Sequence, residues 1–256
     1  MERLDEKRVS ELDVLAGIHV HYLQHLADPE FALEDGTIRL AAGVYDLGAG
    51  AVLEVITKRL RLLGDEDKLV HPPQLRGEGA VIRRDVDDGF AVETFSEGVV
   101  IEQVSVRSLA ESNMAVLEGS ATVAFCDVRG SVLVDEGAKM LLKNSVVHGC
   151  SRSAVYARGT ATIQGCTVLD NQMFGIHVKG EATVTGTTVR RCGDSVVVVG
   201  KATLGEGCQI TDNTSAGIVA WKDEGSPAEV TVEAGVVCEG NNSNDRLVPV
   251  ACRRCQ

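Results

Sequence analysis

The segment from Gly119 to about Gly225 consists of imperfect copies of one short sequence, and this repetition constrains the fold more than any other feature. The copies begin at five glycines, spaced by 18 to 22 residues: Gly119, Gly137, Gly159, Gly180 and Gly200. Such a period is typical of solenoids, in which each copy forms one turn and neighbouring turns bury each other's apolar side chains. A stacked repeat fold is therefore predicted.

Each copy contains three short apolar runs separated by Gly, Asn and Asp. In the copy that begins at Gly159 the runs are Ala161–Ile163, Cys166–Val168 and Ile176–Val178. Their alternation of apolar and polar residues predicts three strands per turn and no helix. Turns stacked about 4.8 Å apart would pair each strand with its copies above and below, which gives a parallel β-helix with three long sheets.

The alignment of the copies also predicts which side chains point inward. The inward set is Ala121, Ala161, Ala182 and Ala202, then Val123, Ile163, Val184 and Leu204, and on the next sheet Val128, Val147, Val168, Val189 and Ile210. The threonines between the first two sets point outward, and we expect Lys139 to interrupt their column.

Two corner columns follow from the same alignment. The bend after the second strand is formed in successive turns by Cys150, Asn171, Cys192 and Asn213. We interpret it as a structural ladder in which Asn amides bond the backbone, with a ligand role for the asparagines as the alternative. One residue earlier lie Asp170, Arg191 and Asp212, whose alternating charges are expected to pair along the solenoid and keep the strands in register.

Turns of this kind resemble the right-handed, pectate-lyase-like β-helix of carbohydrate-binding proteins and sugar hydrolases. Segments Asp35–Leu47 (DGTIRLAAGVYDL) and Val55–Asp67 look like the opening turns of such proteins, and Gly79–Ser108 looks like the turns that follow. The resemblance covers roughly residues 35–240. It implies an all-β, single-stranded, right-handed parallel β-helix of about nine to ten turns.

Two terminal regions depart from the repeat. Residues 1–34 carry apolar side chains at three- and four-residue steps, which predicts an amphipathic helix up to about residue 27 that caps the open end of the solenoid. Residues 241–256 leave the pattern and are expected to form a tail. Its Cys252 and Cys255 lack the further ligands of a zinc site.

The N-terminal region also contains three histidines. His19, His21 and His25 cannot all share one helical face, so we expect no metal site and no cofactor.

Net charge and cysteine use limit the partners and the compartment. The formal charge of −12 argues against nucleic acid as the main partner, and an acidic polysaccharide meets the same objection unless a local basic strip exists. Neither a membrane span nor a signal peptide is visible. We expect a soluble intracellular protein, cytoplasmic or, after removal of a leader, organellar. Cys126, Cys166 and Cys208 share a column with Ser145 and Thr187, which favours reduced thiols.

One interpretation of the outward residues is a carbohydrate-active enzyme, as the family resemblance implies. A lyase, epimerase or hydrolase would need a base and a cation on one face, and His148, His177, Arg190 and Asp170 are the candidates. The Asp-Pro-His-Asp motif of epimerases is missing. Asp87–Asp88 lacks the neighbours seen in polygalacturonase-like hydrolases, whose chemistry needs separated acid and base carboxylates.

The other interpretation is a non-catalytic binding scaffold or structural subunit of a larger assembly. Tyr156, His177 and Val219 are expected to follow one another on the outer side of the last strand of each turn, with Trp221 beside them. Exposed aromatic and apolar residues gathered in this way are typical of protein interfaces. We favour this interpretation, with a protein as the partner and a polysaccharide as the second partner class.

Overall fold

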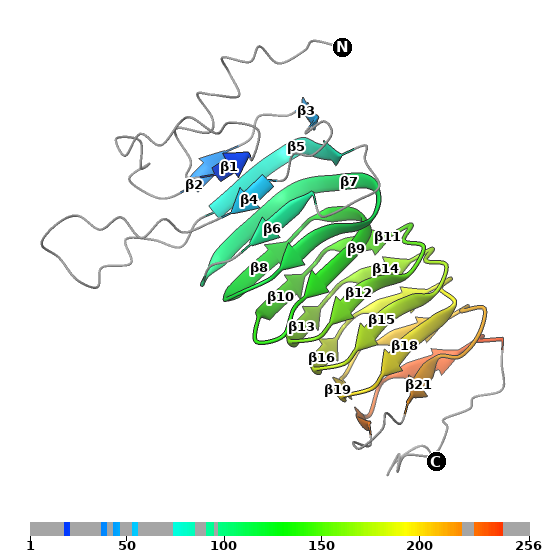
Figure 1. Ribbon diagram of the computed structural model, residues 1–256. Helices are drawn as coiled ribbons and strands as arrows, with labels where there is room; N and C mark the ends of the chain where they lie inside the picture. The colour runs from blue at the N-terminus through cyan, green and yellow to red at the C-terminus, as the bar shows by residue number, and fades with distance from the viewer. Residues whose placement is uncertain are drawn as a thin grey trace, which may run out of the picture.

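The chain folds into an all-β parallel solenoid of about six turns. The computed structural model describes residues 91–94, 97–221 and 228–242, with the backbone alone for residues 108–112. It also describes the backbone of strands at 18–20, 37–39, 43–46, 53–55 and 74–84, and in the last of these the side chain of Ile82. Every regular element in these residues is a β-strand, and none is a helix. Figure 1 shows the strands stacked one above another along a single axis.

The strands form three stacks, and long bent strands pass from one stack into the next. The first stack contains β2 (Thr37–Arg39), the starts of β5 (Gln74–Arg84) and β7 (Val99–Val116), β8 (Ser120–Ala124), β10 (Lys139–Lys143), β13 (Thr160–Gln164), β16 (Glu181–Thr185), β19 (Lys201–Leu204) and β22 (Glu229–Val232).

The second stack contains β3 (Gly43–Asp46), later parts of β5 and β7, the start of β9 (Asp127–Val134), β11 (Val146–His148), β14 (Thr167–Leu169), β17 (Thr188–Arg190), β20 (Gln209–Thr211) and β23 (Val237–Glu239). The third contains β1 (Ile18–Val20), β4 (Leu53–Val55), β6 (Val92–Thr94), the ends of β7 and β9, β12 (Ser153–Ala157), β15 (Phe174–Val178), β18 (Asp194–Val198) and β21 (Ile218–Ala220).

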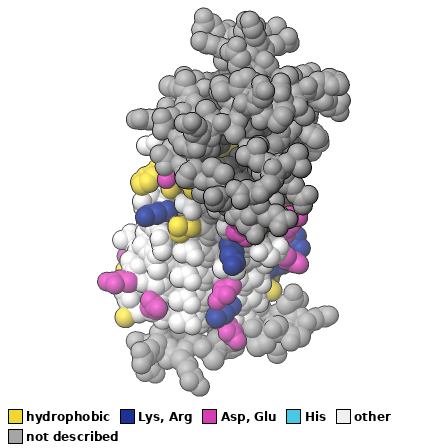
Figure 2. Space-filling view, turned by 90° about the vertical axis from the view of Figure 1, so that its left-hand side faces the viewer, with side chains coloured by type: hydrophobic (Ala, Val, Ile, Leu, Met, Phe, Trp, Pro, Cys, Tyr) yellow, Lys and Arg dark blue, Asp and Glu magenta, His cyan; other side chains and the backbone are white. Residues whose placement is uncertain are grey.

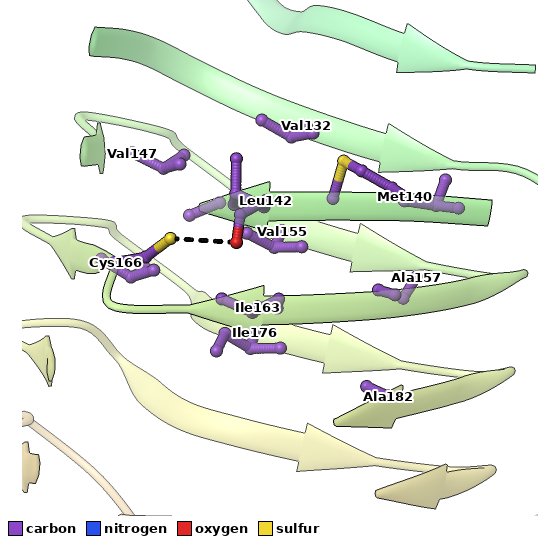
Figure 3. Close-up of a cluster of buried hydrophobic side chains, with 14 of the residues drawn as sticks. Val132, Met140, Leu142, Val147, Val155, Ala157, Ile163, Cys166, Ile176 and Ala182 are labelled. Carbon is purple, nitrogen blue, oxygen red and sulfur yellow. Dashed lines mark hydrogen bonds between the residues drawn. The ribbon is translucent and has the colours of Figure 1, made fainter. Parts of the chain in front are cut away.

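The predicted inward columns are confirmed. Ala161 pairs with Ala182 and Ile163 with Val184, and all four side chains are buried. Side chains from all three stacks meet inside the solenoid, as Figure 3 shows for ten labelled residues. A fourth inward column comes from the third stack, where Val155, Ile176 and Val196 lie in register. Each buried aliphatic side chain of this size contributes about 1.5–3 kcal/mol.

The predicted position of Lys139 is wrong. Lys139 pairs with Ser120 and Thr160, and the residue that interrupts the threonine column is Leu141. The reason is a longer corner, because Ala138 is an extra residue between the leading glycine and the strand of this turn.

The column of thiols and hydroxyls lies at the corner between the first and second stacks. Ser145 Oγ accepts a hydrogen bond from the backbone N–H of Cys126 at 3.1 Å, and Thr187 Oγ1 accepts one from Cys166 at 3.3 Å. Each hydroxyl also donates to a carbonyl two residues earlier in its own turn. A thiol therefore alternates with a hydroxyl that satisfies the backbone of the turn before it.

The ladder at the next corner is structural, as predicted. Asn171 Oδ1 accepts from the N–H of Cys150, and Asn213 Oδ1 accepts from the N–H of Cys192, both at 2.9 Å. Asn241 continues the ladder, although the sequence assigns it to the tail, since its Oδ1 accepts from Asn213 Nδ2 at 2.8 Å. Buried amides that bond the neighbouring turn fix the spacing of the bend.

The predicted N-terminal helix is wrong where the structure describes it. Residues Ile18–Val20 form strand β1, which pairs antiparallel with β4, because the edge of the third stack offers the backbone hydrogen bonds that a helix would otherwise supply. The rest of the predicted helix and the Cys252 and Cys255 pair lie outside the described residues. Among the described residues, no helix has the length and apolar character needed to span a membrane.

Candidate functional site: an aromatic surface on the third stack

The outer side of the third stack carries a column of two rings followed by two valines. Tyr156 pairs in register with His177, then Val197, then Val219. Trp221, one position beyond the end of β21, donates its backbone N–H to Val198 at 2.8 Å, in the place where Lys179 bonds Ala157. The structure therefore brings all four predicted binding residues, Tyr156, His177, Val219 and Trp221, to one side of the solenoid.

Four rings form a continuous surface there, which we call the aromatic surface: Tyr156, Phe174, His177 and Trp221. The Tyr156 and His177 rings stack with centroids 4.9 Å apart. Phe174 meets His177 edge-on at 5.2 Å and Trp221 edge-on at 6.0 Å, so it joins the two ends. Ring pairs in these arrangements gain about 0.5–1.5 kcal/mol beyond their buried area.

A small apolar cluster supports the rings from below. Val197, Ala216 and Val219 are buried together although they lie outside the main core, and Phe174 packs against them. Val219 is only 8% exposed, so it shapes the aromatic surface but presents little of itself to a partner. Trp221 is 47% exposed and Met173, next to Phe174 in the chain, is 46% exposed. The rings thus stand on a rigid base and remain accessible at the Trp221 end.

His177 is the polar member of this surface. Its Nε2 atom is buried and has no hydrogen-bond partner among the described residues. Burial, followed by the nearby charge of Lys179, lowers the pKa of His177 below its ordinary value of 6.5. The imidazole is therefore held neutral near pH 7 and behaves as an aromatic ring.

The candidate catalytic residues are split between two stacks. His148 and Arg190 lie on the outer side of the second stack, two strands apart with Leu169 between them, whereas His177 lies on the third. His148 Nε2 is 3.0 Å from Asp127 Oδ1, which would orient the imidazole as a base. Among the described residues no group of three or more His, Cys, Asp or Glu side chains is arranged to hold a metal ion.

Asp170 occupies the corner between these stacks and is held by an ion pair. Arg191 Nε and Nη2 lie 2.6 and 3.0 Å from the two carboxylate oxygens, in a bidentate pair between adjacent turns. This hydrogen-bonded pairing lowers the pKa of Asp170. Asp170 and Arg191 thus form the predicted charge pair, while Asp212 contributes only a longer-range attraction to Arg191.

Phe174 is the functional candidate that the sequence did not indicate. It opens β15 in register with Ser153 and Asp194, so the copies offer no aromatic column that would mark it. The only sequence signal is its place next to Met173 in an otherwise polar corner.

The comparison with protein families concerns the solenoid as a whole. Residues 88–242, more than half of the chain, match the family described as "Right handed beta helix region". None of the curated proteins compared with the chain matches it.

Proposed function

This chain belongs to the right-handed β-helix family, and on that premise we propose that it acts as a non-catalytic scaffold that binds a protein partner through the aromatic surface. The proposal also allows a structural role within a larger assembly, since the stacked turns of a solenoid present an extended surface to partners.

The observation that carries the proposal is the continuous run of rings from Tyr156 to Trp221. Aromatic residues make up only 4% of the chain, yet the third stack gathers three of them with His177 on its outer side. Large rigid rings supply most of the binding energy at protein interfaces, and they cluster on well-packed supports such as the Val197 and Val219 pair.

The competing proposal is a carbohydrate-active enzyme that acts on an extended glycan. It needs His148, His177, Arg190 and Asp170 to act together. Asp170 is engaged by Arg191, and His177 Nε2 is buried on a different stack from His148 and Arg190. These positions favour the scaffold, and a polysaccharide remains the second partner class because sugar rings also pack on aromatic faces.

We further infer that the solenoid extends to nine to ten turns, as the sequence predicts. The pairing of β2 and β3 with β5, of β5 with β7, and of β4 with β6 supports additional turns before residue 91. The free state of Cys126, Cys166, Cys192 and Cys208 supports an intracellular, reducing compartment.

The experiment that tests the scaffold replaces the exposed rings. The variant Trp221→Ala with Tyr156→Ala should weaken partner association by about thirtyfold or more, because truncating interface rings of this kind costs about 2 kcal/mol or more. The parent protein and the variant are each immobilised on a resin and exposed to a native extract. The captured proteins are then quantified by mass spectrometry. Purified partners are then titrated against both.

A matched control is Phe125→Ala, which removes a ring that is 57% exposed at a different corner. It should leave association unchanged, and all variants should keep a single cooperative thermal transition at a temperature near that of the parent. If the double variant binds purified partners as tightly as the parent does, the aromatic surface is not the interface.

A further inference from the structure

Basic side chains form a column along the outer side of the second stack. Strand pairing places Arg107, Arg129, His148, Leu169 and Arg190 at one position in successive turns, and we call this set the arginine column. Arg83 holds the next register position before Arg107. From Arg107 to Arg190 the column covers four strand spacings, about 19 Å. The chain thus carries a basic strip despite its net charge of −12.

Two other charged columns of the solenoid combine opposite charges. Lys201 Nζ lies 3.1 Å from Glu181 Oε1, and Arg191 is paired with Asp170. On the face shown in Figure 2, basic and acidic side chains lie next to one another. Opposite charges on adjacent strands stabilise the pairing and like charges weaken it. Stacking Arg107 on Arg129 therefore costs stability, and a partner that supplies negative charge would offset that cost.

Acidic neighbours compensate only part of the column. Asp127, in the adjacent outward position, lies 3.0 Å from His148 Nε2 and 4.0 Å from Arg107 Nη2. Among the described residues, no acidic side chain lies within 4.0 Å of the guanidinium of Arg129 or Arg190, and both side chains are exposed. Arg129 extends over Gly149, where an added Cβ would come within 3.5 Å of its Cγ. Two guanidinium groups thus remain available on either side of His148 and Leu169.

The chemistry of the strip selects a carboxylate-bearing protein segment. Guanidinium groups bind carboxylates with two parallel hydrogen bonds. Leu169 is half-buried and Val146 is 36% exposed, so apolar surface lies between the cations. No Phe, Tyr or Trp side chain is among the described outward residues of this stack, so it lacks a flat ring for a sugar. One turn of an α-helix rises about 5.4 Å, close to the strand spacing of about 4.8 Å.

We propose that the arginine column binds an acidic amphipathic α-helix of a protein partner, laid along the solenoid axis. Arg129 and Arg190 lie three strand spacings apart, about 14 Å, so carboxylates about three helical turns apart pair with them, and an apolar side chain between these carboxylates packs on Leu169. This site is independent of the aromatic surface, since it uses a different stack and its test uses different variants.

The test titrates the full chain with a labelled synthetic helical peptide that carries glutamates on one stripe with leucines between them. The same peptide with glutamines in place of the glutamates is the first comparison, and a labelled oligogalacturonate is the second. We expect saturable binding of the glutamate peptide that weakens with added salt. Arg129→Gln with Arg190→Gln should weaken it about tenfold, since two charged contacts are lost.

A matched control variant removes two positive charges from a different stack. Lys139→Gln with Lys143→Gln alters exposed side chains of β10 on the first stack and should leave binding within about twofold of the parent, since only long-range charge changes. Equal weakening by both pairs of substitutions would mean that net charge alone acts, which overturns the proposal. Failure of the glutamate peptide to bind overturns it as well. Binding of the oligogalacturonate in place of the peptide would assign the strip to an acidic polysaccharide.

Discussion

At the residue scale, the leading glycines of the copies are required for two different reasons. Gly137 has a φ of +80°, a conformation that side chains disfavour, and nothing lies within 4 Å of the place where its Cβ would be. Gly180 has no such φ. A Cβ on Gly180 would instead overlap the backbone oxygens of Arg158 and Gly159 in the turn before it. One position serves a backbone bend, and the other serves close contact between turns.

Replacing Gly180 by alanine should therefore destabilise the protein. We expect a loss of roughly 1–3 kcal/mol in the free energy of unfolding, because the added methyl group meets backbone that cannot move without disturbing the strand pairs. Urea unfolding followed by circular dichroism measures the change. Gly137→Asn is the control and should stay within about 1 kcal/mol of the parent, since Asn tolerates a positive φ and the site is open. An equal loss of unfolding free energy in the two variants would contradict the different roles assigned to Gly180 and Gly137.

His177 should make the stability of the third stack depend on pH. Its folded-state pKa lies below 6.5, so the folded protein prefers the neutral ring. As the pH falls below 6.5, the unfolded chain takes up a proton that the folded chain resists, and stability declines until the folded pKa is passed. When the pH is lowered from about 7.5 to about 5.5, we expect the melting temperature of His177→Phe to fall less than that of the parent. An equal fall in the melting temperature of the parent and the variant would show that His177 does not titrate in this way.

At the scale of the element, each strand is short and depends on its neighbours in the stack. β14 has three residues and buries only Val168, which lies in register with Val147 and Val189. Isolated strands of this length are not stable. Their stability comes from the inward column and from the backbone bonds to the turns above and below.

The substitution Val168→Asp should unfold the central turns. Val168 is fully buried, and an aspartate there would place a charge between apolar neighbours without a partner. We expect a cost of roughly 4 kcal/mol or more, measured by thermal melting. The neighbouring Thr167 is half-buried on the outer side of the same strand, so Thr167→Asp is the matched control and should shift the transition only slightly. An unchanged melt of Val168→Asp would refute the column assignment.

At the scale of the whole molecule, the described turns share one main core, and five of the described cysteines belong to it. Cys126, Cys166, Cys192 and Cys208 are buried and free, and Cys150 is also buried. Burial raises the pKa of Cys126 to about 11 and also raises the pKa of Cys166, Cys192 and Cys208. Thiols with such pKa values stay protonated and react slowly near neutral pH.

Counting the reactive thiols should distinguish the denatured protein from the native protein. After denaturation without a reductant, we expect all eight cysteines of the chain to react, because Cys126, Cys166, Cys192 and Cys208 are free and buried in one core. In the native protein the five buried thiols should react far more slowly than the exposed Cys238. A denatured count of four or fewer would instead indicate disulfides and would also weaken the assignment to a reducing compartment.

The period of the glycines and the alternation within each copy were enough to derive the solenoid, the inward columns and the asparagine corner. These features are local, since a side chain's face follows from its place in the strand and equivalent places repeat in every turn. The same reasoning placed Tyr156, His177, Val219 and Trp221 on one side. It failed at Lys139, where one extra residue changed the offset, and at Ile18–Val20, where a strand edge competed with helical periodicity.

Only the tertiary structure decided which side chains meet. Phe174 joins His177 to Trp221, although the copies give it no aromatic equivalent. Arg107 lies before the aligned copies, so only the observed register shows that it shares a column with Arg129 and Arg190. Contacts between turns depend on the length of each corner and on the direction in which side chains lean. The sequence of a single turn therefore determines its own strands, and the stacking of all the turns determines its surfaces.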